Sequence, residues 1–493
     1  MKRIKLIFSI FTALIALSCS ESYLDKQPLD TINTENYPQT AAELITIVNG
    51  AYQPLQWPKL YNLRMWTSDI MAGNSIVGAG GGTDGIETQN MSNFVTQPDN
   101  AGVLDLWRGP WPGILMSNIV LEAAPSLNID ENIKNRSIGE AYFLRANYYF
   151  ILARYFGDVP LVTKPLSSDD DLFPARNPVS EIYDLIISDL KNAIQLLPTK
   201  SSYSQQDIGR ASKGAAYGTL AKVYLTLGNY QETVDMVTQV EGLGYALNLN
   251  YASNFDINNE NSQESIFEVQ YASDGGYSFW NNENQASWAS PFMGPRGSNF
   301  VGGSFGWNQP TQEFINQYEA GDLRKDVTIL YEGCPDFDGK QYQSSYSLTG
   351  FNVRKFLVPL SVVSSYDNSP LNFPVLRYSD VLLMKAEALN ELGQTLQAET
   401  YINMVRNRAG LDNIQSGLSK NDFRDAVLKE RRIELAFEGQ RWFDLIRVNN
   451  GEYGLDFLHA IGKTNATQKH LLFPVPQIEI DRNPKLLPQN PGY

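Results

Sequence analysis

Apolar residues recur at helical spacing in several long segments of the chain. Residues 41–52 place Leu44, Ile45, Val48 and Tyr52 on one side of a helix. Another helix is expected from about residue 102 to residue 124, with an interruption at its two prolines. The intervening residues 69–100 are rich in Gly, Asn, Ser and Thr and are predicted to form a long loop.

The strongest helical pattern begins at Asn135. Apolar or aromatic residues fall on most turns as far as Phe156, and few charged residues interrupt them. A helix that is apolar on all sides is typical of a buried position. Gly157 and Pro160 follow and are expected to end it.

Two later segments repeat one pattern. A large residue, a leucine and a small residue recur in the first helix of each copy, as in tetratricopeptide repeats. In both copies this small residue precedes a close-packing residue of the second helix by twelve positions, Ala221 before Thr233 and Ala386 before Ala398. One such hairpin could be any amphipathic pair, but two with the same offset predict helical repeats. Residues 423–437 and 441–448, hinged at Gly439, form a possible third pair.

Residues 250–372 differ from the repeats on either side. They hold many Gly, Asn and Ser residues and short apolar runs such as Ser265–Tyr271. Because the repeats resume afterwards, we interpret this region as an insertion of loops and short strands in one mainly α domain of helical repeats. That domain covers residues 19–493, with a scaffold at 40–245 and 375–450.

The first residues resemble a bacterial lipoprotein signal. Basic residues precede a short apolar run, and small residues come before Cys19. The run is too short to span a bilayer, which needs about 20 residues. We therefore expect residues 1–18 to be a signal peptide and Cys19 to carry lipid, the alternative being a disulfide with Cys334.

Charge and composition restrict the chemistry. The net charge of −15 argues against binding to nucleic acid or anionic lipid. With only two histidines and two cysteines, the chain offers no zinc ligand pattern and no Ser-His-Asp arrangement. Gly80–Gly82 lacks the lysine of a phosphate-binding loop. We expect no metal and no cofactor.

Several motifs resemble the SusD/RagB family of outer-membrane nutrient-binding lipoproteins. They are "YLDKQP" near the start, "EAYFLRANYYF" with "YFGDVPLV", "RYSDVLLMKAEALNELG", "VRNRAGL", "KERRIELAFEGQRWFDLIR" and the tail "LFPVPQIEIDRNPKLLPQNPGY". The resemblance implies four tetratricopeptide-type helix pairs under a loop-rich ligand face. It also implies a lipid-anchored protein on the outer membrane, exposed at the cell surface, that passes oligosaccharide to a SusC-like TonB-dependent transporter without chemical change.

The insertion carries the residue types that bind neutral sugars. Flat aromatic rings cover the C–H face of a sugar, while amide and charged groups bind its hydroxyls. The segment "SDGGYSFWNNENQASW" and its surroundings supply Tyr277, Trp280, Asn281, Asn282, Trp288, Arg296 and Trp307. The family resemblance adds Asp69, at an acidic motif position, and Asn74 and Phe94 in the following loop. The alternatives are that each tryptophan fills the core and that Asp69 caps a helix or turn.

Three other functions stay open on the sequence alone. A related branch of the family binds peptides, although the Trp- and Asn-rich insertion favours sugar. A glycoside hydrolase would need two carboxylates about 5–10 Å apart, which the many acidic residues could supply. A scaffold lipoprotein would use its repeats to bind only other proteins.

Overall fold

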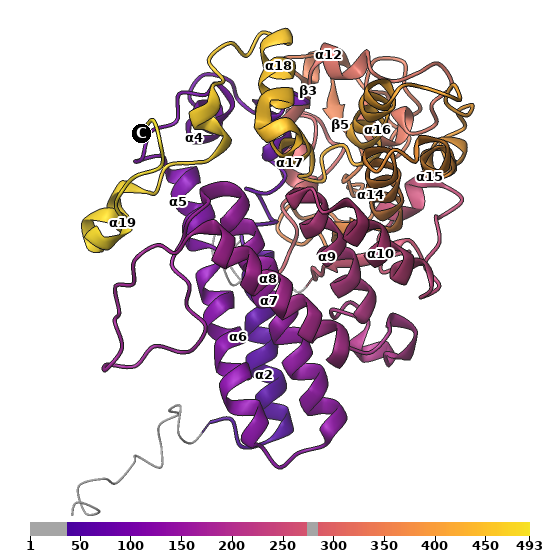
Figure 1. The fold of residues 1–493 in the computed structure, drawn as a ribbon. Helices are drawn as coiled ribbons and strands as arrows, with labels where there is room; N and C mark the ends of the chain where they lie inside the picture. Colours follow the sequence, from indigo (N-terminus) through magenta and orange to yellow (C-terminus); the bar gives the residue numbers. More distant parts are fainter. Residues whose placement is uncertain (1–36, 274–283) are drawn as a thin grey trace, which may run out of the picture.

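A helical scaffold carries a loop-rich region with short strands. The computed structural model describes residues 37–273 and 284–493, so the predicted signal peptide and Cys19 lie outside the described residues. Figure 1 shows the first long helices packed along one another at the lower left: α2 (Ala41–Tyr52), α6 (Trp111–Ala123), α7 (Glu131–Phe156) and α8 (Val179–Leu196). The mainly α class is confirmed.

Local sequence sets the ends of these helices. Thr40 and Glu43 form a capping box at the start of α2. The Asp130 carboxylate accepts hydrogen bonds from two backbone N–H groups at the start of α7. The core face of α7 is as expected, because its aromatic residues from Phe143 to Phe156 are buried.

Both predicted repeats form antiparallel helix pairs. The four small or close-packing residues with the shared offset are all fully buried, which lets the two helices of each pair approach closely. The turns pass through Gly228 at φ 75° and Gly393 at φ 77°, a conformation that favours glycine. The pairs are α9 (Lys213–Leu227) with α10 (Tyr230–Glu241) and α14 (Tyr378–Glu391) with α15 (Thr395–Arg408).

A third pair follows the second repeat. Gly439, between its helices, has φ 73°, and a Cβ there would lie 2.6 Å from the Met65 carbonyl oxygen, so glycine is required. The helices are α16 (Lys420–Glu434) and α17 (Arg441–Arg447), followed by α18 (Glu452–Ala460) and α19 (Gln477–Arg482). Within the described ranges, no helix combines the length and apolar character needed to cross a bilayer.

The predicted loop at residues 69–100 contains regular structure instead. It holds most of α3 (Ser68–Met71), then β1 (Ser75–Gly78) and α4 (Ile86–Ser92), and α5 (Ala101–Arg108) follows before the expected break. Strand β1 pairs antiparallel with β3 (Trp307–Pro310). The composition concealed this strand because its partner lies more than 200 residues away.

The inserted region leaves and rejoins the scaffold through neighbouring strands. The apolar run that begins at Ser265 forms β2 (Ser265–Val269), which pairs antiparallel with β6 (Phe373–Arg377), and β6 leads directly into α14. Between them lie short elements: α11 (Ala289–Met293), α12 (Gln312–Ile315), α13 (Lys325–Thr328), β4 (Ile329–Leu330) and β5 (Asn352–Val353). One hydrophobic core contains side chains from the insertion and from the scaffold.

Candidate ligand-binding site

Part of the predicted ligand set cannot be placed. Tyr277, Trp280, Asn281 and Asn282 lie outside the described residues. The Ala272 N–H donates to the Gln285 carbonyl oxygen at 3.0 Å, so the described residues on the two sides of that segment are hydrogen-bonded to each other.

Trp288 and Trp307 are core residues. Their exposed fractions are 5% and 7%. The Trp288 ring stacks on Phe292 at 5.0 Å and 4°, and the Trp307 ring meets the same phenylalanine edge-on at 5.5 Å. The expectation that these two indoles show flat faces to solvent is wrong. The alternative, that each tryptophan fills the core, is correct for both.

Asp69, Asn74 and Phe94 are buried as well. Asp69 accepts hydrogen bonds from Asn74 Nδ2 at 2.7 Å and from the backbone N–H groups of Phe437 and Gly439 at 3.2 and 3.0 Å. Phe94 packs against Trp442. Through these contacts residues 69–94 are held against the segment that follows α16. Because the three side chains are buried, the expectation that they lie on a ligand face is wrong.

Arg296 is the described candidate that reaches solvent. Its Nη1 donates to the Phe305 carbonyl oxygen at 3.0 Å and lies 3.9 Å from Asp84. Both side chains are about half exposed. This exposed pair lies over Gly80, where a Cβ would come within 3.2 Å of the guanidinium. The two described tryptophans do not join it at the surface.

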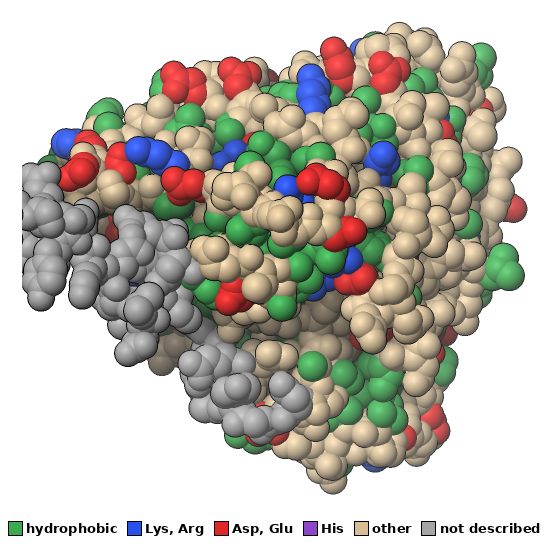
Figure 2. All heavy atoms as spheres, turned by 90° about the horizontal axis from the view of Figure 1, so that it is seen from below, with side chains coloured by type: hydrophobic (Ala, Val, Ile, Leu, Met, Phe, Trp, Pro, Cys, Tyr) green, Lys and Arg blue, Asp and Glu red, His purple; other side chains and the backbone are tan. Residues whose placement is uncertain are grey.

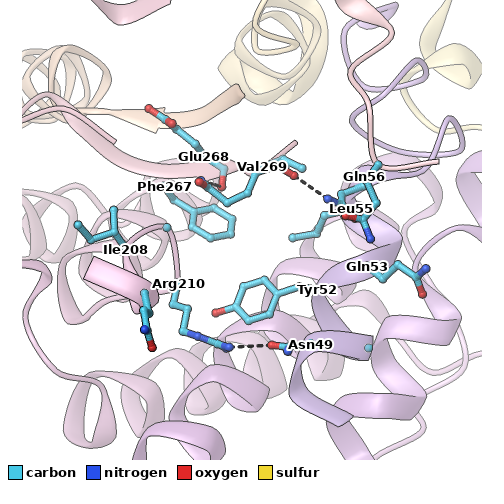
Figure 3. A pocket seen from close by; sticks show the side chains of 15 residues that line it. Asn49, Tyr52, Gln53, Leu55, Gln56, Ile208, Arg210, Phe267, Glu268 and Val269 are labelled. Atoms are coloured by element: carbon cyan, nitrogen blue, oxygen red, sulfur yellow. Dashed lines mark hydrogen bonds between the residues drawn. The ribbon is translucent and has the colours of Figure 1, made fainter. Parts of the chain in front are cut away.

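The sequence did not reveal an open cleft of about 470 Å³ between α2 and β2. Figure 3 shows its walls: the C-terminal end of α2, the turn at residues 206–210 and β2. The ring of Tyr52 projects into it and Ile208 adds apolar surface, while Phe267 and Leu55 form its floor and are almost fully buried. Its volume falls in the range of about 300–1,000 Å³ typical of small-molecule sites.

Hydrogen bonds fix the frame of the cleft. Gln56 Nε2 donates to the Gln270 carbonyl oxygen at 2.7 Å and joins the segment after α2 to the end of β2. The turn at residues 206–210 comes close to the same strand, because Gly209 has φ 98° and a Cβ there would lie 2.5 Å from Gln270 Cδ. Glycine at position 209 therefore permits the close approach that shapes this wall.

Tyr52 presents a neutral side chain to the cleft. Burial, together with the nearby Glu140, raises the pKa of Tyr52 well above its ordinary value, so the hydroxyl stays protonated. That hydroxyl accepts a hydrogen bond from the Ala211 N–H at 2.8 Å. The ring thus offers an apolar face whose polar end is already bonded.

Three amide side chains in the lining are available to a ligand. The side chains of Gln53, Gln206 and Gln285 line the cleft, and none forms a hydrogen bond within the described part of the chain. A primary amide donates and accepts at once, as a sugar hydroxyl does. Apolar rings with unpaired amides are suited to binding a polar uncharged molecule.

Among the described residues that line the cleft there is no pair of carboxylates that could act as acid and base. Glu268 is the carboxylate in its lining, and Figure 3 shows that side chain turned away from the cavity. It accepts hydrogen bonds from the Asn261 N–H and from Asn372 Nδ2, both at 3.1 Å. Nowhere in the described ranges do three or more His, Cys, Asp or Glu residues cluster as a metal site would require.

Comparisons with protein families cover most of the chain. The sequence model described as "SusD family" matches residues 250–493. A second, described as "Starch-binding associating with outer membrane", matches residues 22–225. SusD-like protein P2 of Formosa agariphila is 28% identical over the full length of both chains. A SusD-like protein of Bacteroides ovatus is 28% identical, over 90% of this chain and 82% of its own length.

Solved structures share the fold. A laminarin-binding SusD-like protein superposes with a TM-score of 0.80 at 28% identity, covering 92% of this chain and all of the other. Surface glycan-binding protein A from Bacteroides thetaiotaomicron, in complex with laminarihexaose, gives 0.78 at 25% identity, covering 92% of this chain and 99% of its own.

Proposed function

Because the chain belongs to the SusD/RagB family, we propose that it is a non-catalytic lipoprotein that captures glycan at the cell surface. It is held in the outer membrane by lipid on Cys19 and passes its ligand to a SusC-like TonB-dependent transporter. The observation that carries the proposal is the cleft between α2 and β2, with the ring of Tyr52 and its unpaired amides.

Two further features support glycan as the ligand. Structural neighbours of this chain include a laminarin-binding protein and a complex with laminarihexaose. The segment predicted to bind sugar, with Tyr277, Trp280, Asn281 and Asn282, lies in sequence between Gln270 and Gln285, which both line the cleft. We propose these four residues as additional ligand contacts there, and Arg296, which does not line the cleft, as a separate contact at the surface.

The peptide alternative finds less support at this cleft. An extended peptide would bind by adding a strand to a free sheet edge. At the end of β2 the Gln270 carbonyl oxygen, which such a peptide would need, already accepts a hydrogen bond from Gln56.

Affinity gel electrophoresis tests the proposal. The protein without its signal peptide is run through gels containing laminarin, starch or other polysaccharides, with serum albumin as the non-binding control. We expect retardation by at least one glycan, and no new reducing ends when protein and glycan are incubated together. Unretarded migration in every gel would refute glycan capture, and release of reducing ends would refute the non-catalytic role.

A further inference from the structure

We infer that the cleft between α2 and β2 selects uncharged glycan chains and excludes chains that carry sulfate or uronic acid. This inference rests on the proposed function and adds the substrate class of the same site. It follows from how the charged groups around the cleft are paired and from which polar groups stay unpaired.

Arg210 is the cation in the lining, and its charge is already balanced. Its Nη1 donates to Glu140 at 2.8 Å and its Nη2 to Asn49 at 2.7 Å, a contact drawn in Figure 3. Its Nε lies 3.2 Å from Asp207. A second guanidinium, that of Arg136, shares the same two carboxylates, at 2.9 Å from Asp207 and 3.5 Å from Glu140.

Two guanidiniums therefore meet two carboxylates, and neither cation is left over for an anionic ligand. Glu140 is almost fully buried, so an anion that drew Arg210 away would leave a buried carboxylate with a weakened partner. Breaking such a pair is costly. Arg210 therefore lines the cleft but is not available to bind a sulfate or carboxylate group of a ligand.

Two carboxylates lie behind the cleft. Glu268 and Glu260 both accept hydrogen bonds from Asn372, at 3.1 Å from its Nδ2 and 2.7 Å from its backbone N–H. Within the described ranges neither carboxylate forms an ion pair. Burial, opposed by the Asn372 N–H and assisted by Glu268, raises the pKa of Glu260 to about 7. Glu260 is therefore only partly ionised at neutral pH, and these two carboxylates offer no attraction to an anion in the cleft.

The broader surface gives no contrary attraction. Figure 2, which shows one face of the molecule, has basic and acidic side chains interspersed over its described part, without a continuous basic area. The chain as a whole carries −15. The field of the protein therefore does not concentrate anions near its surface.

The groups that remain for a ligand are neutral. Gln53, Gln206 and Gln285 supply unpaired amides, and Tyr52 supplies a ring that the C–H face of a sugar can cover. A ligand bound only by amides and rings owes little to Coulomb attraction. Its affinity should therefore change little with ionic strength.

A matched pair of ligands tests the inference. Isothermal titration compares the native protein with laminarin and with sulfated laminarin, and with starch and sulfated starch. We expect sulfation to weaken binding by at least about ten-fold, because each sulfate brings an unpaired charge to a cleft whose described lining holds no unpaired cation. Binding of the neutral chain should stay constant from about 50 to about 500 mM sodium chloride.

Variants place the effect in this cleft. Replacing two of the three unpaired amides, in Gln53→Ala with Gln206→Ala, should weaken neutral-glycan binding by about ten-fold. Gln205→Ala is the matched control, because Gln205 adjoins Gln206 and is exposed but does not line the cleft. It should bind like the native protein.

The outcomes separate the two claims. Equal or tighter binding of the sulfated chain would overturn the neutral selectivity while leaving glycan capture intact. Native affinity in the double variant would likewise overturn the assignment to this cleft. Failure to bind any of the four glycans, with retardation absent in the gel series as well, would overturn the proposed function and this inference with it.

Discussion

At the scale of single residues, buried polar side chains join parts of the chain that are far apart in sequence. Asp69 lies near the N-terminal end of the described chain, yet its carboxylate accepts hydrogen bonds from the backbone N–H groups of Phe437 and Gly439. Asn74 donates to Asp69 and accepts from Arg432 at 2.7 Å. Both carboxylate oxygens of Asp69 therefore accept hydrogen bonds from other residues of the protein, although the sequence suggested that Asp69 contacts a ligand.

The first prediction concerns the pH dependence that Asp69 imparts. Burial raises the pKa of Asp69 from 3.8 to about 6, although Asn74 and the two N–H groups oppose the rise. The folded state therefore holds this proton more tightly than the unfolded state. The contribution of Asp69 to the free energy of unfolding should fall as pH rises from about 4 to about 6.

Urea unfolding between pH 4 and pH 7 measures this effect. Asp69→Asn carries no titrating group, so its decline in stability across that range should be shallower than that of the native protein. Asp84→Asn, at an exposed carboxylate, is the control and should keep the native slope. Parallel profiles for the native and Asp69→Asn proteins would show that this carboxyl does not titrate as proposed.

At the scale of elements, buried charges connect α16 with β6 and α15. Glu434, at the end of α16, lies 2.9 Å from Arg377 of β6, 2.5 Å from Arg408 of α15 and 3.2 Å from Arg324. Burial alone would raise the pKa of Glu434, but these three guanidiniums outweigh it and leave the pKa well below its usual range. The carboxylate is ionised and central to the contact between these elements.

The second prediction removes that charge. In Glu434→Gln three buried guanidiniums keep their charge and lose a shared partner, so the free energy of unfolding should fall by about 3–5 kcal/mol. Denaturant unfolding at pH 7 measures the loss. Glu452→Gln, at an exposed glutamate in the first turn of α18, should change stability by less than about 1 kcal/mol. Equal effects in the two variants would refute the role given to Glu434.

The sequence predicts these elements better than it predicts the site. The repeats are predictable because the close packing of two neighbouring helices requires small residues at a fixed spacing in the sequence, such as Ala221 and Thr233. The sequence around Trp307 does not indicate its burial, because the residues that cover it are distant in sequence. Gly85 is one of them, since a Cβ there would lie 2.5 Å from the indole. Its polar sequence neighbours suggested exposure, and long-range packing decided otherwise.

The cleft escaped prediction for a related reason. Its walls come from residues 49–56, 206–210 and 267–270, which the fold brings together from separate parts of the chain. Glutamine is common on surfaces, and nothing in its immediate sequence marks Gln53 or Gln206 as a cleft residue. The unpaired state of these amides becomes visible only when their surroundings in space are known.

At the scale of the whole molecule, the last prediction concerns the attachment of the protein at Cys19. A single acyl chain binds a membrane only marginally, but several chains on one cysteine hold a soluble domain stably. In Cys19→Ser we therefore expect no incorporation of labelled palmitate in the producing bacterium and loss of the processed protein from the outer-membrane fraction.

Cys334→Ser is the matched control, because Cys334 is the other cysteine and is buried and unpaired among the described residues. This variant should be labelled and retained like the native protein. Palmitate labelling that persists in Cys19→Ser would refute the anchor, and loss of labelling in Cys334→Ser would assign it to the wrong thiol.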